Sequence, residues 1–250
     1  MKILSLETST AAPAFAAVEL NENHAILRAA TRVLDQPRRL SSQAMLCIAA
    51  VLEESDWTLD DLDAIAVSIG PGSWTGLRIG LASAKTLAQA RDLPLIGVPS
   101  LDALTLAARS VRICDYCLYF AFAPCRAGEI YVKSWLTRDL ELELLHEERI
   151  AAPQQIADEI LASPPPRLAL ISTPGAGMRA LAEVSDLLRG IGMETLEVAP
   201  EIFAQNVARL AALRLQNGER DDPLSLSPLY LAPSNAERVL AAKLARESAP

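Results

Sequence analysis

Short hydrophobic stretches alternate with longer, helix-like patterns along the whole chain. In the first half, the periodicity predicts strands near residues 2–8, 14–20, 24–33, 63–69 and 94–98, and helices near 40–54, 73–91 and 100–109. In the second half, it predicts strands near 116–122, 130–137, 141–149, 167–172 and 194–198, and helices near 153–162, 176–190 and 200–216. Both halves have the order βββαβαβα, and this repetition indicates two units of one design.

This order predicts an α/β protein of two tandem lobes, each built on a mixed sheet. In each lobe the first three strands are linked by hairpins, and the later strands alternate with helices. We expect the first lobe to cover residues 1–110 and the second to cover 111–220. Residues 221–250 are expected to form an extended tail, because Pro223, Pro228 and Pro233 enforce it. Within the tail, 229–231 are expected to dock on the body and 235–247 to form a short helix.

The predicted helix at 40–54 has no polar face over most of its length. Residues 44–52 are nine apolar residues in a row, preceded by Ser41 and Ser42 as candidate caps. Such a helix is expected to be buried all round. An outer helix of a layered domain normally has a polar outside, so a second apolar face indicates that another chain covers it. The run is too short to span a membrane.

The predicted helix at 73–91 has a small residue at every fourth position, namely Gly76, Gly80, Ala84 and Ala88. A ridge with so few side-chain atoms lets another helix approach closely. The same ridge is expected where a helix packs tightly on its own sheet. The pattern alone is compatible with either arrangement.

A turn rich in glycine and proline precedes this helix. Pro71 fixes one backbone angle, Gly70 and Gly72 permit positive φ and close approach of another surface, and Ser73 is a candidate cap. A Rossmann-type dehydrogenase is a poor match for this turn. Its glycines are spaced G-x-G-x-x-x-G, they follow the fourth strand, and no acidic residue ends the next strand.

Composition narrows the class of protein. A hydrophobic content of 51% is ample for a core, and a net charge of −8 argues against autonomous binding to nucleic acid. The N-terminus enters a strand at once, without a signal peptide, so a cytoplasmic protein is expected. Cys114 and Cys117 form a C-x-x-C pair near Cys125, but they flank or enter a strand and no histidine cluster is near. Reduced thiols are favoured over a zinc or redox site.

Three segments resemble the bacterial TsaB (YeaZ) family: LSLETST at 4–10, GPGSWTGLRIGLASAK at 70–85 and PLIGVPSLDAL at 94–104. The resemblance is strong over residues 1–110 and weaker beyond. It implies the two-lobed fold of the actin, hexokinase and Hsp70-like ATPases. It also implies a non-catalytic subunit that works with TsaD, the enzyme that transfers a threonylcarbamoyl group to N6 of an adenosine beside the tRNA anticodon, and with the ATPase TsaE.

The resemblance and the two unusual helices together predict how this chain meets its partners. A heterodimer with a TsaD-type subunit is expected to use both helices, and a homodimer is expected when that subunit is absent. Transfer RNA is expected to be engaged only indirectly, and no membrane contact is expected. Arg78 is either a ligand for a carboxylate or phosphate of the partner or a solvated charge. The predicted interface residues are Met45, Ile48, Ala49, Leu52, Gly72, Trp74, Gly76, Arg78, Gly80, Ala84 and Ala88.

No catalytic or metal-binding residue is expected in this chain. In TsaD, the segment that corresponds to residues 97–104 carries an H-x-x-x-H pair, which binds a metal ion. Here these two positions hold Ser100 and Leu104. Leucine cannot bind a metal and serine is a poor ligand, so the metal-assisted chemistry of TsaD is not expected here.

Departures from the family pattern weaken the case for nucleotide binding by this chain alone. The first loop has Glu7 where Asp is usual, Leu40 stands where His is common, Pro124–Cys125 and 172–175 replace polar loops, and Ala232 replaces Arg. No cofactor of its own is expected, and ATP or ADP is a candidate only at the joint with the partner. An autonomous small-molecule kinase of the same fold is the alternative, but it needs a catalytic Asp and intact phosphate loops. Candidate nucleotide-contacting residues are Glu7, Thr8, Ser9, Gly70 and Gly72.

Overall fold

The computed structural model describes residues 1–34, 36–111, 116–126, 128–138 and 141–232. Its strands are β1 (Lys2–Glu7), β2 (Ala14–Leu20), β3 (Ile26–Val33), β4 (Ala64–Gly70), β5 (Leu95–Pro99), β6 (Leu118–Pro124), β7 (Ile130–Arg138), β8 (Glu141–Ala151), β9 (Leu168–Ser172) and β10 (Met193–Glu197). Its α-helices are α1 (Leu40–Glu54), α2 (Trp74–Arg91), α3 (Ser100–Val111), α4 (Pro153–Ala162), α5 (Ala176–Leu187) and α6 (Pro200–Gln216). Every strand and helix of the predicted order is present.

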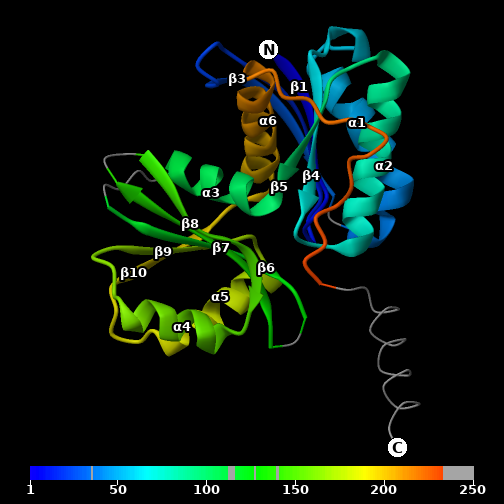
Figure 1. Cartoon of the computed structure of the whole chain (residues 1–250). Coiled ribbons are helices and arrows are strands. Elements are labelled where there is room, and N and C mark those ends of the chain that lie inside the picture. Colours follow the sequence, from blue (N-terminus) through cyan, green and yellow to red (C-terminus); the bar gives the residue numbers. More distant parts are fainter. Residues whose placement is uncertain (35, 112–115, 127, 139–140, 233–250) are drawn as a thin grey trace, which may run out of the picture.

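The two halves of the chain form two five-stranded sheets of the same topology (Figure 1). The first sheet has the order β3-β2-β1-β4-β5, and the second has the order β8-β7-β6-β9-β10. In each, the first strand pairs antiparallel with the second and parallel with the fourth. This correspondence confirms the predicted α/β class with two lobes of the same design.

The helices and sheets form five layers. Helices α1 and α2 cover the outer face of the first sheet, and α4 and α5 cover the outer face of the second (Figure 1). Helices α3 and α6 lie between the two sheets, where one hydrophobic core joins side chains from both halves. The core therefore runs from one lobe into the other.

Helix α6 belongs to the second half in sequence order but packs on β1, β2, β3 and β5 of the first sheet. Its buried residues include several small ones, among them Ala204, Ala208 and Ala211, which are fully buried. Small side chains let the helix axis approach the sheet closely. The Ser5 hydroxyl of β1 also donates a hydrogen bond to the Ala204 carbonyl oxygen at 2.8 Å. Helix α6 thus connects the second half to the first sheet.

Helix α1 departs from its prediction in two ways. It begins at Leu40 after Arg39, without a side-chain cap, and the Ser42 hydroxyl instead donates to the Arg39 carbonyl oxygen. Only one face of the helix is buried, through residues such as Ile48 and Val51, whereas Met45 and Leu46 are 52% and 66% exposed. The expectation of burial all round is wrong for the chain alone. Because each buried aliphatic side chain contributes about 1.5–3 kcal/mol, packing compensates for the missing cap.

The small-residue ridge of α2 faces the inside of its own lobe. A Cβ atom added at Gly76 would lie 2.0 Å from the Thr8 carbonyl oxygen, and one at Gly80 would lie 2.1 Å from the Thr8 hydroxyl oxygen. Ala84 and Ala88 are 0% and 1% exposed within the core between α2 and the first sheet. The ridge therefore permits close approach of the first strand and its loop. Because these residues are buried, a partner helix cannot touch the ridge.

The tail returns across the first lobe after α6. Asp221 forms an antiparallel bridge with Leu95 of β5, and its carboxylate accepts hydrogen bonds from Gly97 N at 2.7 Å and from Arg214 at 3.1 Å. Farther along, Leu229 N donates to the Ile69 carbonyl oxygen at 2.7 Å. The tail is thus held along the edge of the first sheet, as docking of 229–231 predicts. The predicted helix at 235–247 lies outside the described residues.

Enlarging the ridge is expected to destabilise the folded chain. Ala84→Leu adds three carbon atoms where the side chain is fully buried, and overpacking of this kind costs about 1–3 kcal/mol. The free energy of unfolding, measured by urea titration, should fall by that amount. Ala82→Leu is the matched control, because Ala82 is exposed on the same helix. Equal stability of the two variants would contradict the inward orientation of the ridge.

Candidate functional site

The turn between β4 and α2 is packed against the loop that follows β1. Ser73 N donates a hydrogen bond to the Ser9 carbonyl oxygen at 2.7 Å, and the Ser73 hydroxyl accepts one from Gly76 N at 3.2 Å. A Cβ atom at Gly72 would lie 2.3 Å from that Ser9 oxygen, so only glycine permits this approach. Ser73 therefore caps α2 as predicted. The first loop and the turn together fix the position of the N-terminus of α2.

Glu7 is completely buried at the end of β1. One of its carboxyl oxygens accepts hydrogen bonds from Ser9 N at 2.7 Å and from the Ser9 hydroxyl at 2.6 Å. Burial disfavours the charged form and raises the pKa of Glu7 from its ordinary value of 4.5 to about 7, although the bonds from Ser9 act in the opposite direction. Glu7 therefore holds the loop in shape, and its burial keeps its pKa above the ordinary value.

Three of the candidate nucleotide-contacting residues have buried side chains. Glu7 and Thr8 are 0% exposed, and Ser9 is 6% exposed. The Thr8 hydroxyl lies against Gly80 of α2, where an added Cβ atom would come within 2.1 Å of it. These residues pack on one another and on α2.

Three side chains stack on the surface at the first turn of α2. The rings of Trp74 and Tyr230 lie with their centroids 3.8 Å apart, and the Arg78 guanidinium carbon lies 4.5 Å from the Trp74 centroid. Arg78 Nε also donates a hydrogen bond to the Tyr230 hydroxyl at 3.0 Å. The sequence indicated Trp74 and Arg78 but missed Tyr230, which stands 152 residues from Arg78. The sequence did predict that residues 229–231 dock on the body of the protein. It does not indicate that Tyr230 docks beside Trp74 and Arg78.

The predicted interface residues fall into two groups. The first group is exposed or half-buried and consists of Met45, Ala49, Gly72, Trp74 and Arg78. Those buried in the lobe are Ile48, Leu52, Gly76, Gly80, Ala84 and Ala88. The structure therefore leaves an apolar strip on α1 and the stacked residues on α2 exposed or half-buried. The buried group supports these surfaces from inside.

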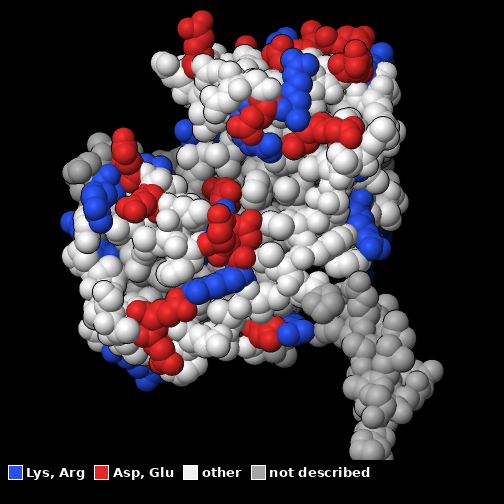
Figure 2. All heavy atoms as spheres, in the orientation of Figure 1, with Lys and Arg blue, Asp and Glu red and all other residues white. Residues whose placement is uncertain are grey.

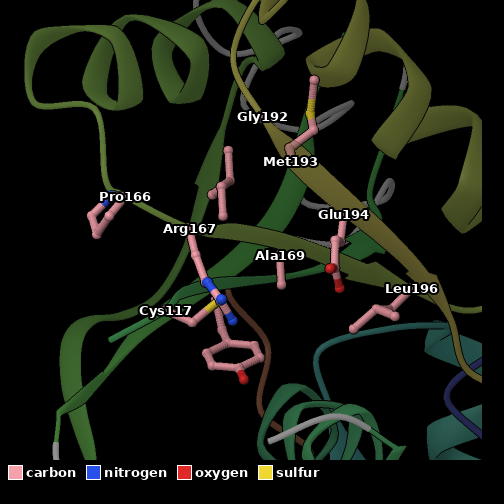
Figure 3. A pocket seen from close by; sticks show the side chains of 10 residues that line it. Cys117, Pro166, Arg167, Ala169, Gly192, Met193, Glu194 and Leu196 are labelled. Carbon is pink, nitrogen blue, oxygen red and sulfur yellow. The ribbon is translucent and has the colours of Figure 1, made fainter. Parts of the chain in front are cut away.

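A separate pocket of about 370 Å³ lies on the second lobe, against β6, β9 and β10 (Figure 3). Its lining includes Arg167, Glu194 and the buried Cys117. Cys114, the other member of the C-x-x-C pair, lies outside the described residues. Within the described ranges, no cluster of His, Cys, Asp and Glu side chains is suited to a metal ion. In the same part of the chain, no helix has the length and apolar character needed to span a membrane.

Sequence comparisons identify relatives of the first half of the chain. A family model for TsaD, tRNA N6-adenosine threonylcarbamoyltransferase, matches residues 35–121. The transferase of that name from Lactiplantibacillus plantarum is 35% identical over 118 residues, covering 47% of this chain and 33% of the transferase. The tRNA threonylcarbamoyladenosine biosynthesis protein TsaB of Bacillus subtilis is 42% identical over 91 residues, covering 36% of this chain and 38% of TsaB. The chain thus matches less than half the length of either relative.

A comparison of structures covers nearly the whole chain. An uncharacterized Pseudomonas aeruginosa protein, described as similar to peptidase YEAZ, has a TM-score of 0.72 and 23% identity, covering 92% of this chain and 99% of that protein. The chain is therefore a two-lobed α/β protein with the YeaZ fold. Three curated sequence relatives named TsaB are 27–42% identical to it. The chain is thus similar in sequence to TsaB proteins over part of its length, and it shares its fold with this YEAZ-like protein.

The raised pKa of Glu7 predicts that stability falls as the pH rises through weakly acidic values. Above pH 4.5 the unfolded chain releases this proton, whereas the folded chain keeps it until about pH 7. The free energy of unfolding should therefore decrease across this window by roughly 3 kcal/mol and level off above it. The measurement is the difference in unfolding free energy between the wild-type chain and Glu7→Gln, determined by urea titration at several pH values.

Glu53→Gln is the control for this experiment, because Glu53 is an exposed carboxylate at the end of α1. The difference in unfolding free energy between Glu53→Gln and the wild-type chain should change little over the same pH range. A Glu7→Gln difference that is equally independent of pH would show that Glu7 ionises in the folded chain much as it does in the unfolded chain.

Proposed function

We propose that this chain is the non-catalytic TsaB-type subunit of the machinery that makes N6-threonylcarbamoyladenosine in tRNA. In this proposal it binds a TsaD-type transferase through α1 and the exposed side of α2, and it orders that subunit for catalysis. The observation that carries the proposal is the exposed apolar face of α1, in a chain whose named relatives act in this modification.

The α1 face has the composition of a protein-binding surface. Met45 and Leu46 are 52% and 66% exposed, and Ala49 continues the strip one turn later. No charged side chain occurs between Leu40 and Leu52. Figure 2 shows the flank formed by α1 and α2 as a mostly uncharged surface, with acidic side chains near its upper end and basic ones near its lower end. A contiguous apolar strip between charged ends is typical of an interface.

The buried ridge changes the part that α2 plays in this interface. A partner cannot reach Gly80 or Ala84, so it contacts the outward side of the helix, where Arg78 and Ala82 are exposed. The exposed apolar side chains of α1 would also be covered if this face packed against its copy in a second chain. We therefore propose a homodimer when the TsaD-type subunit is absent.

The non-catalytic role is supported by the two residues that the resemblance places where TsaD has its histidines. Ser100 and Leu104 lie on α3 and are 2% and 1% exposed, inside the core between the lobes. They offer neither metal ligands nor an open surface to a substrate. The alternative of an autonomous kinase is not favoured, because the first loop around Glu7 is closed by its own packing.

The other partners in this proposal follow from the family. A TsaE-type ATPase acts with the TsaD-type subunit, and tRNA is engaged by the assembled complex in the cytoplasm. The negative net charge of this chain supports an indirect role with tRNA. ATP or ADP, if bound at the joint, is held mainly by the partner, because the side chains of Thr8 and Ser9 are buried.

A charge placed in the α1 face is expected to prevent binding of the TsaD-type subunit. Leu46→Glu puts a carboxylate where the interface excludes water, so affinity should fall by roughly 30-fold or more, while the monomer stays folded. Titration calorimetry with the purified subunit from the same organism measures this. Sedimentation of the chain alone should show a dimer that the same change dissociates.

Leu161→Glu is the matched control, because Leu161 is 48% exposed on α4 of the second lobe. It should leave both assemblies intact. If Leu161→Glu weakens binding as much as Leu46→Glu does, α1 is not the interface.

Reconstitution of the complex from purified proteins tests whether this chain is needed for transfer without catalysing it. The isolated chain should show no threonylcarbamoyl transfer, kinase or peptidase activity. Addition of the TsaD-type and TsaE-type proteins, with tRNA, ATP and the activated threonylcarbamoyl donor, should restore transfer, as measured by nucleoside analysis of the tRNA. Leu46→Glu should remove this activity, because the subunits no longer assemble. Full transfer in the absence of this chain would contradict the proposed role.

A further inference from the structure

The stacked residues Trp74, Arg78 and Tyr230 form a unit that we call the arginine anchor. Arg78 is exposed, but both aromatic rings restrict its position: Trp74 by stacking and Tyr230 by a hydrogen bond from Arg78 Nε at 3.0 Å. The hydroxyl of Tyr230 accepts this bond, and the Tyr230 ring packs on Trp74. A long, flexible side chain is thus held in one orientation at the surface.

The tail is responsible for placing Tyr230 in the anchor. Its neighbour Leu229 donates a backbone hydrogen bond to Ile69, at the end of β4. Upstream, Asp221 binds β5 and Arg214 of α6. Because the tail is fixed at both places, the anchor is assembled within the single chain. Binding of a partner therefore costs little additional conformational entropy at Arg78, because this side chain is already ordered.

The guanidinium of Arg78 retains donors that nothing in the described chain uses. Its Nε is bonded to Tyr230, but no carboxylate of the described residues lies within ion-pair distance of Arg78. By contrast, Arg91 at the other end of α2 pairs with Asp60 at 3.2 Å. A guanidinium group presents a planar fork of donors that matches the two oxygens of a carboxylate. Among the residues that the structure describes, the ordered anchor has no counter-ion.

We propose that the arginine anchor binds a carboxylate side chain of the partner protein at the edge of the α1 and α2 interface. This inference rests on the proposed heterodimer and specifies the chemistry that fixes the partner's position. Arg78 makes the contact, Trp74 excludes water from one side of it, and Tyr230 is a positioning residue that orients the fork. Trp, Tyr and Arg are also the residue types in which binding energy is most often concentrated.

The location favours a pair stronger than an ordinary surface salt bridge. Exposed pairs gain little, because water screens them and two flexible side chains must be immobilised. At the anchor, the aromatic rings already order the arginine, and a bound partner removes the remaining water. Both effects strengthen the attraction between the guanidinium and a carboxylate.

The test measures the affinity of the full-length chain and its variants for the purified TsaD-type subunit by titration calorimetry. Arg78→Gln removes the charge and should weaken binding about 10- to 100-fold. Arg78→Lys keeps the charge but loses the planar fork, and should recover only part of the affinity. Tyr230→Phe keeps the stacked ring but loses the hydroxyl, and should weaken binding about 3- to 10-fold.

Arg91→Gln is the matched control, because it removes an exposed arginine from the same helix, away from the anchor. It should bind like the wild-type chain. All four changes are at exposed positions, and thermal melts should show folded proteins with similar transitions. Acidic residues of the partner are then changed to amides one at a time. One of these changes should weaken wild-type binding and have no further effect on Arg78→Gln.

Three outcomes would overturn the anchor. Unchanged binding by Arg78→Gln, together with loss of binding by Leu46→Glu, refutes the anchor and leaves the heterodimer standing. Failure of the wild-type chain to bind the TsaD-type subunit refutes the proposed function and the anchor with it. An Arg78→Gln effect that appears only when ATP is present assigns the guanidinium to a phosphate group, and not to a carboxylate of the partner.

Discussion

The close approach of α2 to the loop after β1 is the contact on which the rest of the first lobe depends. It exists because Gly72, Gly76 and Gly80 carry no side chain where Ser9 and Thr8 pass. This contact sets the depth of α2 on the sheet, and through α2 it positions α1 and the Trp74 ring. The surfaces that we assign to a partner are therefore consequences of an interior constraint. A side chain at any of these glycines would move the helix as a unit.

Much of the fold was predictable because hydrophobic periodicity is a local property. The order of strands and helices, the duplication and the Ser73 cap all follow from residues close together in the chain. The site was predicted less well, because a pattern of residues on a helix does not show whether that side of the helix faces the protein interior or the surface. The ridge of α2 is compatible with either side of the helix, and only the position of Thr8 decides between them. Tyr230 was missed because its contact joins distant segments.

The α1 helix shows how an incorrect expectation still contained useful information. Nine apolar residues predicted burial on every side, and the single chain buries only one side. The disagreement identifies the exposed strip of Met45 and Leu46 as the feature that needs a partner. Conversely, Glu7 seemed a candidate for binding chemistry, yet its carboxyl serves the loop that surrounds it. Burial, which a sequence does not report directly, separates the two cases.

The position of α6 makes the duplicated halves dependent on each other. Its alanines fill the inner face of the first sheet, and the core that they enter continues to Tyr119 and Ile171 of the second sheet. A chain ending after the first repeat would leave that face of β1 and β2 open to water. The repeat therefore describes how the sequence is organised, but it does not define an autonomous folding unit. Such a shared core is expected to make both halves unfold in a single cooperative transition.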